Sequence, residues 1–149
     1  MIKRRKDEGF TLIELMIVIA VIGILAVVLV PRVGGIKTAA KSAGIDTNIR
    51  AVQAFVQSRV SYWSTQDDYD AAEAGTEITN ALGEDSSEPM RNPIDGLTTT
   101  AFSIADVGDV PGEIYVVIPD TQAGLLADGI EITGIDNNGS VFNRVTIMP

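Results

Sequence analysis

The feature that most constrains this chain is a run of 21 residues, 10–30, in which Glu14 is the only charged side chain and nearly all others are apolar. As an α-helix rising ~1.5 Å per residue, the run would be about 31 Å long. That length matches the ~30 Å hydrocarbon core of a bilayer. The rest of the chain has the composition of a water-soluble domain, so the sequence predicts a membrane-length helix followed by one compact domain.

The composition excludes several kinds of chemistry. The chain has no cysteine and no histidine. Disulfides, thiolate catalysis and cysteine-type zinc sites are therefore excluded, and the commonest general base and metal ligand is missing. We expect no cofactor, and these two absences argue against an enzyme.

Charge is distributed unevenly around a net value of −9. Residues 67–149 contain sixteen acids and two bases, Arg91 and Arg144. Such a surface repels polyanions, so we expect no direct nucleic-acid binding. Residues 32–66 contain five bases and one acid. A basic helix leading into an acidic domain could pair charges with neighbouring copies in an assembly.

The first nine residues have the order of a targeting signal. Four of the first six residues are basic, and the apolar run follows. A secretory signal has the same order, but its core is ~7–15 residues long and ends at an A-x-A-like cleavage site, which is missing after residue 30. A small residue, Gly9, precedes the run instead. The basic residues predict a cytoplasmic amino terminus, and a signal peptide or plain signal anchor remains the simpler alternative.

Residues 9–14, GFTLIE, resemble the processing site of type IV prepilins and the related pseudopilins, and the resemblance continues to Pro31. It implies that residues 1–9 are a leader peptide. A prepilin peptidase would cut between Gly9 and Phe10 and methylate the new amino group of Phe10. Residues 10–30 would be retained as a transmembrane and later filament-core helix.

Glu14 lies within a helix of hydrocarbon length, where a carboxylate costs several kcal/mol and therefore indicates a function. The resemblance implies that Glu14 pairs with the methylated amino terminus, here Phe10, of an adjacent subunit and so sets the stagger between subunits. The simpler alternative is that the Glu14 side chain reaches back to the membrane interface from near the helix end.

Two residues are expected to weaken the helix locally. Pro31 removes an amide donor and crowds the preceding turn, and Gly23 lowers helix propensity by roughly 1 kcal/mol relative to alanine. In type IV pili the helix between matching glycine and proline residues is often stretched out. The resemblance implies the same here in a filament, although both residues are also common in ordinary membrane helices.

Residues 31–65 are predicted to form the amphipathic second half of one long helix over residues 10–65. Apolar residues recur there every three to four positions and should pack on a sheet: Ile45, Ile49, Val52, Val56, Val60 and Trp63. A cofactor or electron-transfer role for the aromatic residues Phe55, Tyr62 and Trp63 is weaker than core packing.

Residues 66–149 are predicted to form a connector and a small antiparallel sheet. Asp70 begins a short helix ending near Leu82, with Glu73 completing a capping-box pattern. Residues 92–96, NPIDG, indicate a turn, and residues 122–126 a turn of helix. Four β-type runs follow in residues 100–105, 113–118, 129–135 and 141–148. The fold class is therefore α+β, with a long helix packed on about four antiparallel strands, as in pilins.

The loop between the last two strands allows two interpretations. Residues 136–139, DNNG, indicate a hairpin turn, because Asn-Gly suits a positive φ angle. Asp136 and Asn138 could instead be calcium ligands, as in related pseudopilins near their carboxyl ends. The loop lacks the spacing of the twelve-residue calcium motif, so the hairpin is favoured and no metal is expected.

The favoured function is a structural subunit of a type IV pilus, serving adhesion, motility or DNA uptake. Its partners would be the prepilin peptidase, the pilus or secretion assembly machinery, membrane lipid before assembly, and other copies in a homo-oligomeric filament. The precursor would cross the inner membrane once, and the filament would lie outside the cell. The alternatives are a pseudopilin of a type II secretion system and, less favoured, a signal-anchored enzyme or binding module.

Overall fold

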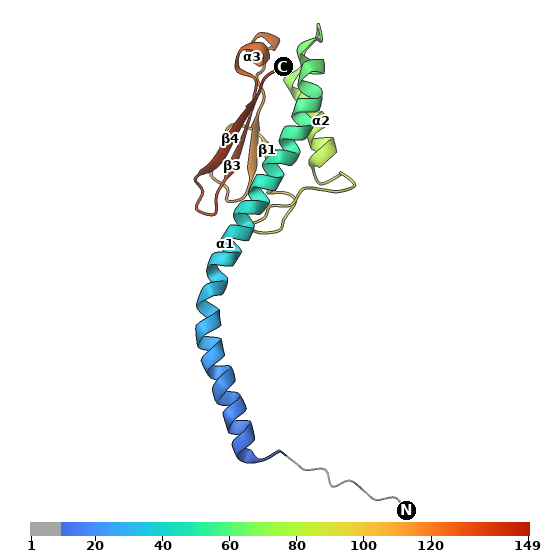
Figure 1. The fold of residues 1–149 in the computed structure, drawn as a ribbon. Coiled ribbons are helices and arrows are strands. Elements are labelled where there is room, and N and C mark those ends of the chain that lie inside the picture. The colour runs from blue at the N-terminus through green and yellow to red at the C-terminus, as the bar shows by residue number, and fades with distance from the viewer. Residues whose placement is uncertain (1–9) are drawn as a thin grey trace, which may run out of the picture. The chain divides into compact units, whose positions relative to one another are not determined.

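The structure, a computed structural model, describes residues 10–149, and for residues 30–34 and 36 it describes the backbone alone. The chain divides into two units, Met1–Lys37 and Thr38–Pro149. The second is called the globular unit below. Its elements are the last part of α1 (Leu12–Ser64), then α2 (Ala71–Leu82), β1 (Phe102–Ile104), β2 (Ile114–Val117), α3 (Gln122–Asp128), β3 (Ile130–Ile135) and β4 (Val141–Ile147) (Figure 1).

The long helix predicted over residues 10–65 is confirmed, because α1 runs unbroken for 53 residues. It continues through Pro31 and both following glycines. Within the globular unit, the predicted apolar stripe of α1 is buried: all six of its residues are at most 4% exposed. Trp63 is buried with the stripe, Phe55 packs against the core from its edge, and Tyr62 is half exposed.

The stripe packs on one face of a four-stranded sheet with strand order β1-β2-β3-β4. Ile130 and Ile132 of β3 are fully buried on this face. At Gly134, two residues further along, a Cβ atom would lie 2.7 Å from Ile49 Cδ1, so the helix and strand approach too closely there for a side chain. The predicted α+β architecture is therefore confirmed, with the core between α1 and the sheet.

The sheet differs from the prediction at one pair of strands. β2, β3 and β4 are antiparallel, as predicted, but β1 pairs with β2 in parallel, with Phe102 opposite Ile114 and Ile104 opposite Val116. The prediction of an all-antiparallel sheet was wrong at this pair. A parallel pair cannot be joined by a tight hairpin. Here residues 105–113 form the crossover connection from the end of β1 back to the start of β2.

Residues 105–113 cross the face of the sheet that lies opposite α1. Gly108 lies against the Tyr115 ring, and a Cβ atom there would come within 2.5 Å of the Tyr115 hydroxyl oxygen. Further along, the Gly112 amide donates to Ile135 O at 3.0 Å. This cover explains why Tyr115, Glu113 and Thr133 are buried although they do not face α1. The Tyr115 hydroxyl donates to Glu113 Oε2 at 2.6 Å.

Hydrogen bonds hold the connector between α1 and β1 to the neighbouring segments of the globular unit. As predicted, Asp70 caps α2: its side chain accepts from the Ala72 amide, and the helix begins at Ala71. The predicted capping box is not formed, because the Glu73 side chain bonds no described residue. The turn at residues 92–96 is present. Asn92 is fully buried at the start of that turn. Its Nδ2 donates to Thr100 O at 2.8 Å and to Pro111 O at 2.9 Å. One amide side chain thus joins the connector to the segments on both sides of β1.

Candidate assembly site

The charged residue of the apolar run lies at the start of α1, in a closed set of hydrogen bonds with Thr11. Glu14 Oε2 accepts from the Thr11 amide at 2.8 Å and from the Thr11 hydroxyl at 2.7 Å. In return the Glu14 amide donates to Thr11 Oγ1 at 3.4 Å. This reciprocal arrangement is a capping box, which satisfies amide groups that would otherwise lack partners at a helix start.

The capping box gives the Glu14 carboxylate a partner within its own chain. Its negative charge lies in the first turn of α1, where the helix dipole favours an anion. A partner for Glu14 was expected only in a neighbouring chain, and Thr11 was missed. The signal was nevertheless present, since a threonine followed three residues later by glutamate ahead of an apolar run is the sequence form of a capping box. Glu14 Oε1 accepts no hydrogen bond from the described residues.

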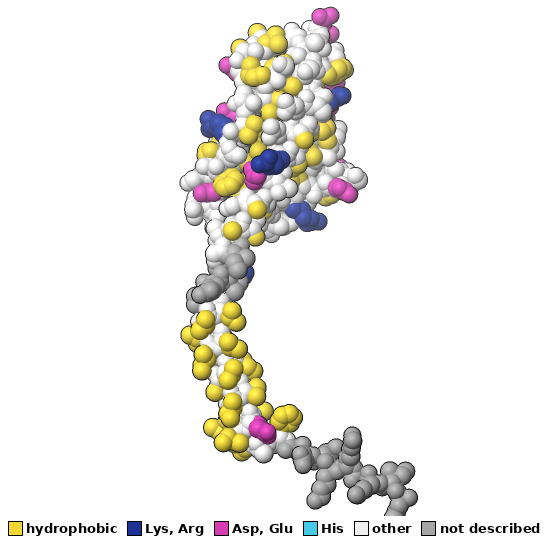
Figure 2. All heavy atoms as spheres, viewed as in Figure 1, with side chains coloured by type: hydrophobic (Ala, Val, Ile, Leu, Met, Phe, Trp, Pro, Cys, Tyr) yellow, Lys and Arg dark blue, Asp and Glu magenta, His cyan; other side chains and the backbone are white. Residues whose placement is uncertain are grey.

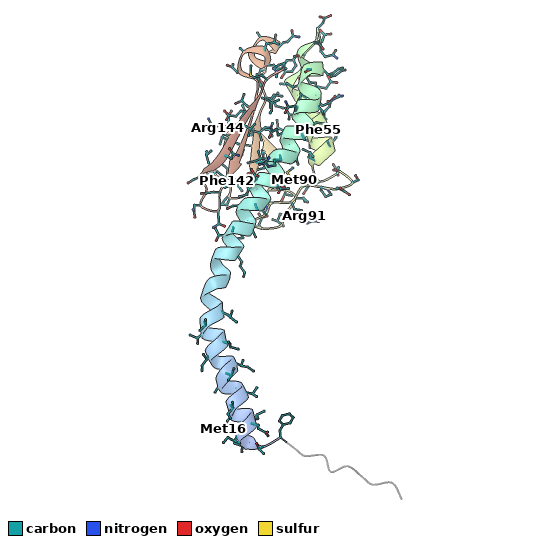
Figure 3. The ribbon with its side chains drawn as sticks, in the orientation of Figure 1. Met16, Phe55, Met90, Arg91, Phe142 and Arg144 are labelled. Atoms are coloured by element: carbon teal, nitrogen blue, oxygen red, sulfur yellow. The ribbon has the colours of Figure 1, made fainter. Side chains whose placement is uncertain are left out.

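The surface of α1 beyond the capping box is apolar. The stretch Leu12–Leu29 has a mean hydropathy of 3.1, and none of it is buried. Figure 2 shows hydrophobic side chains along this part of the helix, and Figure 3 shows Met16 projecting from it. By length and composition this stretch could cross a membrane.

Of the other residues predicted to act in processing and assembly, Phe10 and Gly23 are described in full, and neither is packed against another element. Phe10 is 91% exposed, and Gly9 lies outside the described residues. A Cβ atom added at Gly23 would have no neighbouring atom within 4 Å outside its own helix backbone. The backbone at Pro31 is helical. The local weakening expected of Gly23 and Pro31 in a filament therefore stays a prediction.

The loop at Asp136 is the predicted hairpin. Asp136 Oδ1 accepts from the amides of Asn138 at 2.7 Å and Ser140 at 2.9 Å. These hydrogen bonds, that from Ser140 first, lower the pKa of Asp136 below its ordinary value. Within the loop, only Gly139 has a positive φ angle, 79°. One Asp136 oxygen is thus used to shape the turn, and in the described part of the chain no group of three or more acidic side chains is arranged to hold a metal ion.

Comparisons with known proteins agree with the features of α1. Residues 4–30 match the family model described as the prokaryotic N-terminal methylation motif. The chain is 39% identical over 64 residues to the type IV major pilin protein PilA of Myxococcus xanthus, covering 43% of this chain and 28% of that protein. It is 37% identical over 73 residues to the type II secretion system core protein G of Pseudomonas aeruginosa, covering 46% of this chain and 51% of that protein.

These matches confirm the resemblance to type IV pilins and pseudopilins that residues 9–31 indicated. The chain spans between about a quarter and about half of the length of these two relatives. No solved structure matches the chain. Both relatives bear the names of structural components of a pilus or a secretion system, not of enzymes.

Proposed function

We propose that this chain, which carries the N-terminal methylation motif and resembles both type IV pilins and a type II secretion pseudopilin, is a structural subunit of a type IV pilus. One observation carries the proposal: Leu12–Leu29 forms a helix with no buried residue. So large an apolar surface must be covered by lipid or by other proteins. Lipid would cover it before assembly, and the helices of neighbouring subunits afterwards.

The proposed sequence of events begins in the inner membrane. The precursor would span the membrane once with its amino terminus in the cytoplasm. A prepilin peptidase would cut between Gly9 and Phe10 and methylate the Phe10 amino group. The assembly machinery would then move the helix from lipid into a filament on the cell surface, where adhesion, motility or DNA uptake would follow.

The capping box defines how Glu14 would act in such a filament. The amide and the hydroxyl of Thr11 both donate to Glu14 Oε2, while no described residue donates to Glu14 Oε1. Oε1 is therefore available to the Phe10 ammonium of an adjacent copy, and the Thr11 bonds would hold the carboxylate in place. In this proposal Thr11 positions Glu14, and Glu14 makes the contact between subunits.

Mass spectrometry of the native protein tests the processing step. We expect the mature chain to begin at Phe10 and to carry a methyl group on its amino terminus. A mature chain beginning at Met1, or beginning after Pro31 without the apolar helix, would contradict the proposal.

A Glu14→Gln variant tests the assembly step. It should still insert and be cut, but should assemble into few filaments, because a neutral amide cannot form the proposed ion pair. Glu88→Gln, a change of the same kind at an exposed acid of the connector, is the matched control and should assemble normally. Filaments of normal yield from Glu14→Gln would refute the pairing role.

A pseudopilin of a type II secretion system is the second candidate. It is favoured by the similarity to core protein G, which extends over 51% of that relative. Deletion of the gene in its native host separates the two functions. Loss of surface pili with normal protein export supports the pilus subunit, and loss of export with normal pili supports the pseudopilin.

A further inference from the structure

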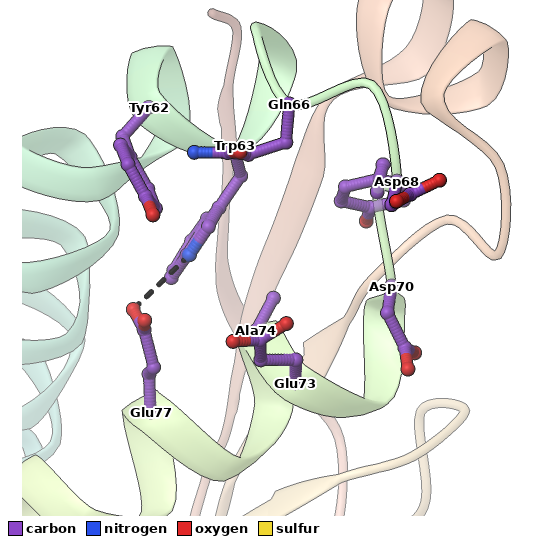
Figure 4. A pocket seen from close by; sticks show the side chains of 9 residues that line it. Tyr62, Trp63, Gln66, Asp68, Asp70, Glu73, Ala74 and Glu77 are labelled. Atoms are coloured by element: carbon purple, nitrogen blue, oxygen red, sulfur yellow. Dashed lines mark hydrogen bonds between the residues drawn. The ribbon is translucent and has the colours of Figure 1, made fainter.

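A pocket of about 190 Å³ lies in the globular unit where α1 ends and α2 begins. Aromatic side chains, Tyr62, Trp63 and Tyr69, form part of its lining (Figure 4). Acidic side chains form another part: Asp68, Asp70, Glu73 and Glu77. Aromatic faces combined with carboxylates are the surroundings that bind an organic cation.

Glu77 is held at this pocket by two side chains of α1. Arg59 binds Glu77 through two hydrogen bonds of 2.7 and 2.9 Å, and the Trp63 indole donates to Glu77 Oε2 at 3.1 Å. The Arg59 guanidinium also lies 4.8 Å from the centre of the Tyr62 ring. Hydrogen bonds from Arg59 lower the pKa of Glu77, so this pair is ionised and contributes no net charge.

The remaining carboxylates of the pocket are less engaged. Asp70 uses Oδ1 to cap α2 at the Ala72 amide. Asp68 and Glu73 have no side-chain hydrogen bond or ion pair with another described residue. The pocket therefore carries a net negative charge. Among residues 10–149 no group of three acids is arranged to hold a metal ion. With its aromatic and acidic lining, the pocket suits a cationic side chain better than a bare metal.

A matching cation lies on the same unit, at its opposite end. Three of the described arginines already have carboxylate partners: Arg50 with Asp46, Arg59 with Glu77 and Arg144 with Glu131. Lys41, near the start of the globular unit, has no ion pair within the part of the chain that the structure describes. At ~1.5 Å per residue, the 21 steps along α1 from Lys41 to Tyr62 span about 32 Å.

Two acids at this end of the globular unit, Asp46 and Asp95, already have other partners. The connector between α1 and β1 contacts α1 at this end of the globular unit, where Asn48 Nδ2 donates to the Arg91 carbonyl at 2.9 Å. Asp95 follows in that connector, and its two carboxylate oxygens accept from the Leu97 amide and the Thr100 hydroxyl. Arg91 itself donates to the Gly96 carbonyl at 3.2 Å.

We propose that the aromatic and acidic pocket at the end of α1 receives the Lys41 side chain of a second copy of this chain, displaced by about 32 Å along the helix direction. This inference rests on the proposed filament function. The contact joins two different surfaces of the same protein, and such head-to-tail contacts propagate as open filaments where the rotation between copies does not close a ring. The Lys41 ammonium would lie between Asp68 and Glu73, against the aromatic wall.

A zero-length carbodiimide reaction on native filaments tests the contact, because it joins an amine to a carboxylate only when the two touch. We expect peptides that link Lys41 to Asp68 or Glu73. Within one copy, Lys41 lies about 32 Å along α1 from Tyr62, which lines the same pocket as Asp68 and Glu73. The link is too short to bridge that separation, so it must join two copies. Filaments in which Lys41 is linked only to other acids, or to none, would overturn the inference.

Charge exchange gives a second test in the full chain. Lys41→Glu and Glu73→Lys should each lower filament yield at least about fivefold, the effect of ~1 kcal/mol per contact, and together they should restore it. Lys37→Glu, one helical turn away, is the matched control and should not be rescued by Glu73→Lys. Equal rescue of Lys37→Glu, or no rescue of Lys41→Glu, would overturn the assignment.

The single tryptophan, Trp63, separates this contact from a small-molecule site. n-Butylammonium added to the monomeric full chain in detergent should leave Trp63 fluorescence nearly unchanged at millimolar concentrations, because one free amine lacks the rest of the contact. Saturable binding without the Lys41 link in filaments would overturn the inference. Failure of the unaltered chain to form any filament in its native host would instead refute the proposed function.

Discussion

The two ends of α1 are parts of one helix but have opposite surroundings. Within Leu12–Leu29 no residue is buried. Between Ile45 and Trp63, one stripe of the helix is almost completely buried against the sheet. The first region is apolar on all sides, whereas the second is apolar on one side only. A helix that is apolar all round needs surroundings that cover every side, and an amphipathic helix needs a partner on one side.

The difference teaches where each region obtains its stability. The globular unit has its own core between α1 and the sheet, so its folding depends on packing within one copy. The apolar region has only its backbone hydrogen bonds, its capping box and whatever covers it. Changes in the two regions should therefore give different kinds of effect: loss of folding in one, and loss of membrane insertion or assembly in the other.

The largest expected difference is between Ile49→Ala and Ile19→Ala. Ile49 is 1% exposed and Ile19 is 62% exposed. Ile49→Ala should lower the free energy of unfolding of the globular unit by about 2–5 kcal/mol, because it leaves a cavity in the core. Ile19→Ala should change it by less than about 0.5 kcal/mol. Urea unfolding of the full chain in detergent micelles, followed by Trp63 fluorescence, measures both. Equal shifts would show that the two regions are energetically coupled.

A second test uses high pH, which should affect only the globular unit. Burial, and then the hydrogen bond to Glu113, raise the pKa of Tyr115 from 10.0 to about 12. Because the folded-state pKa is the higher one, the stabilisation is complete below pH 10 and is lost as the pH rises toward 12. The loss should reach about 3 kcal/mol.

Unfolding titrations of Tyr115→Phe at several pH values check this expectation. The variant should lack most of the decline above pH 10 that the unaltered chain shows. Tyr62→Phe is the control, since Tyr62 is half exposed, and it should retain the decline. An identical pH dependence in Tyr115→Phe and the unaltered chain would contradict the role of Tyr115.

Glycine substitutions should have opposite signs in the two regions. At Gly134 a new Cβ would lie 2.7 Å from Ile49 Cδ1 and 3.0 Å from Ile45 Cγ2. Gly134→Ala should therefore destabilise the globular unit by about 1–3 kcal/mol through overpacking. Gly23 has open space, so Gly23→Ala should instead stabilise its helix by up to about 1 kcal/mol. Urea unfolding measures the first change, and amide hydrogen exchange near residue 23 the second. A stabilising Gly134→Ala would contradict the close approach of β3 and α1.

The smallest expected effect is at the capping box. Thr11→Ala removes the hydroxyl that bonds the Glu14 side chain and amide. It should destabilise the first turn of α1 by about 1 kcal/mol, seen as faster amide exchange at residues 12–15 in micelles. Thr11→Ser keeps the hydroxyl and should exchange as the unaltered chain does. No change in the globular unit is expected from either variant.

The sequence predicted the elements well and their pairing less well. The apolar period of residues 45–63, the four β-type runs and the hairpin at Asp136 each depend on neighbouring residues, and all are present. The parallel pairing of β1 with β2 was missed, because it depends on the path of residues 105–113 across the sheet. Local pattern carries no information about that path, and the segment contains turn-forming residues that also suit a hairpin.

The candidate sites show the same division. Glu14 stood out because a charge in an apolar helix is conspicuous in any sequence. Its partner Thr11 was readable from the spacing and was overlooked. By contrast, the pocket beside Trp63 is lined by residues of α1, of α2 and of the loop between them. The proposed Lys41 contact depends on knowing that Arg50, Arg59 and Arg144 already have acidic partners. Neither follows from spacing.

By itself, the sequence determined that this protein has a membrane-length helix with one acid near its start and an amphipathic continuation, because hydrophobic pattern along one chain decides what a helix can bury. Only the tertiary structure decided which strands run parallel, which face of the sheet residues 105–113 cover, and which charges remain unpaired among the described residues. Those outcomes depend on contacts between residues far apart in the chain, whose free energies are settled by the packing of the whole unit.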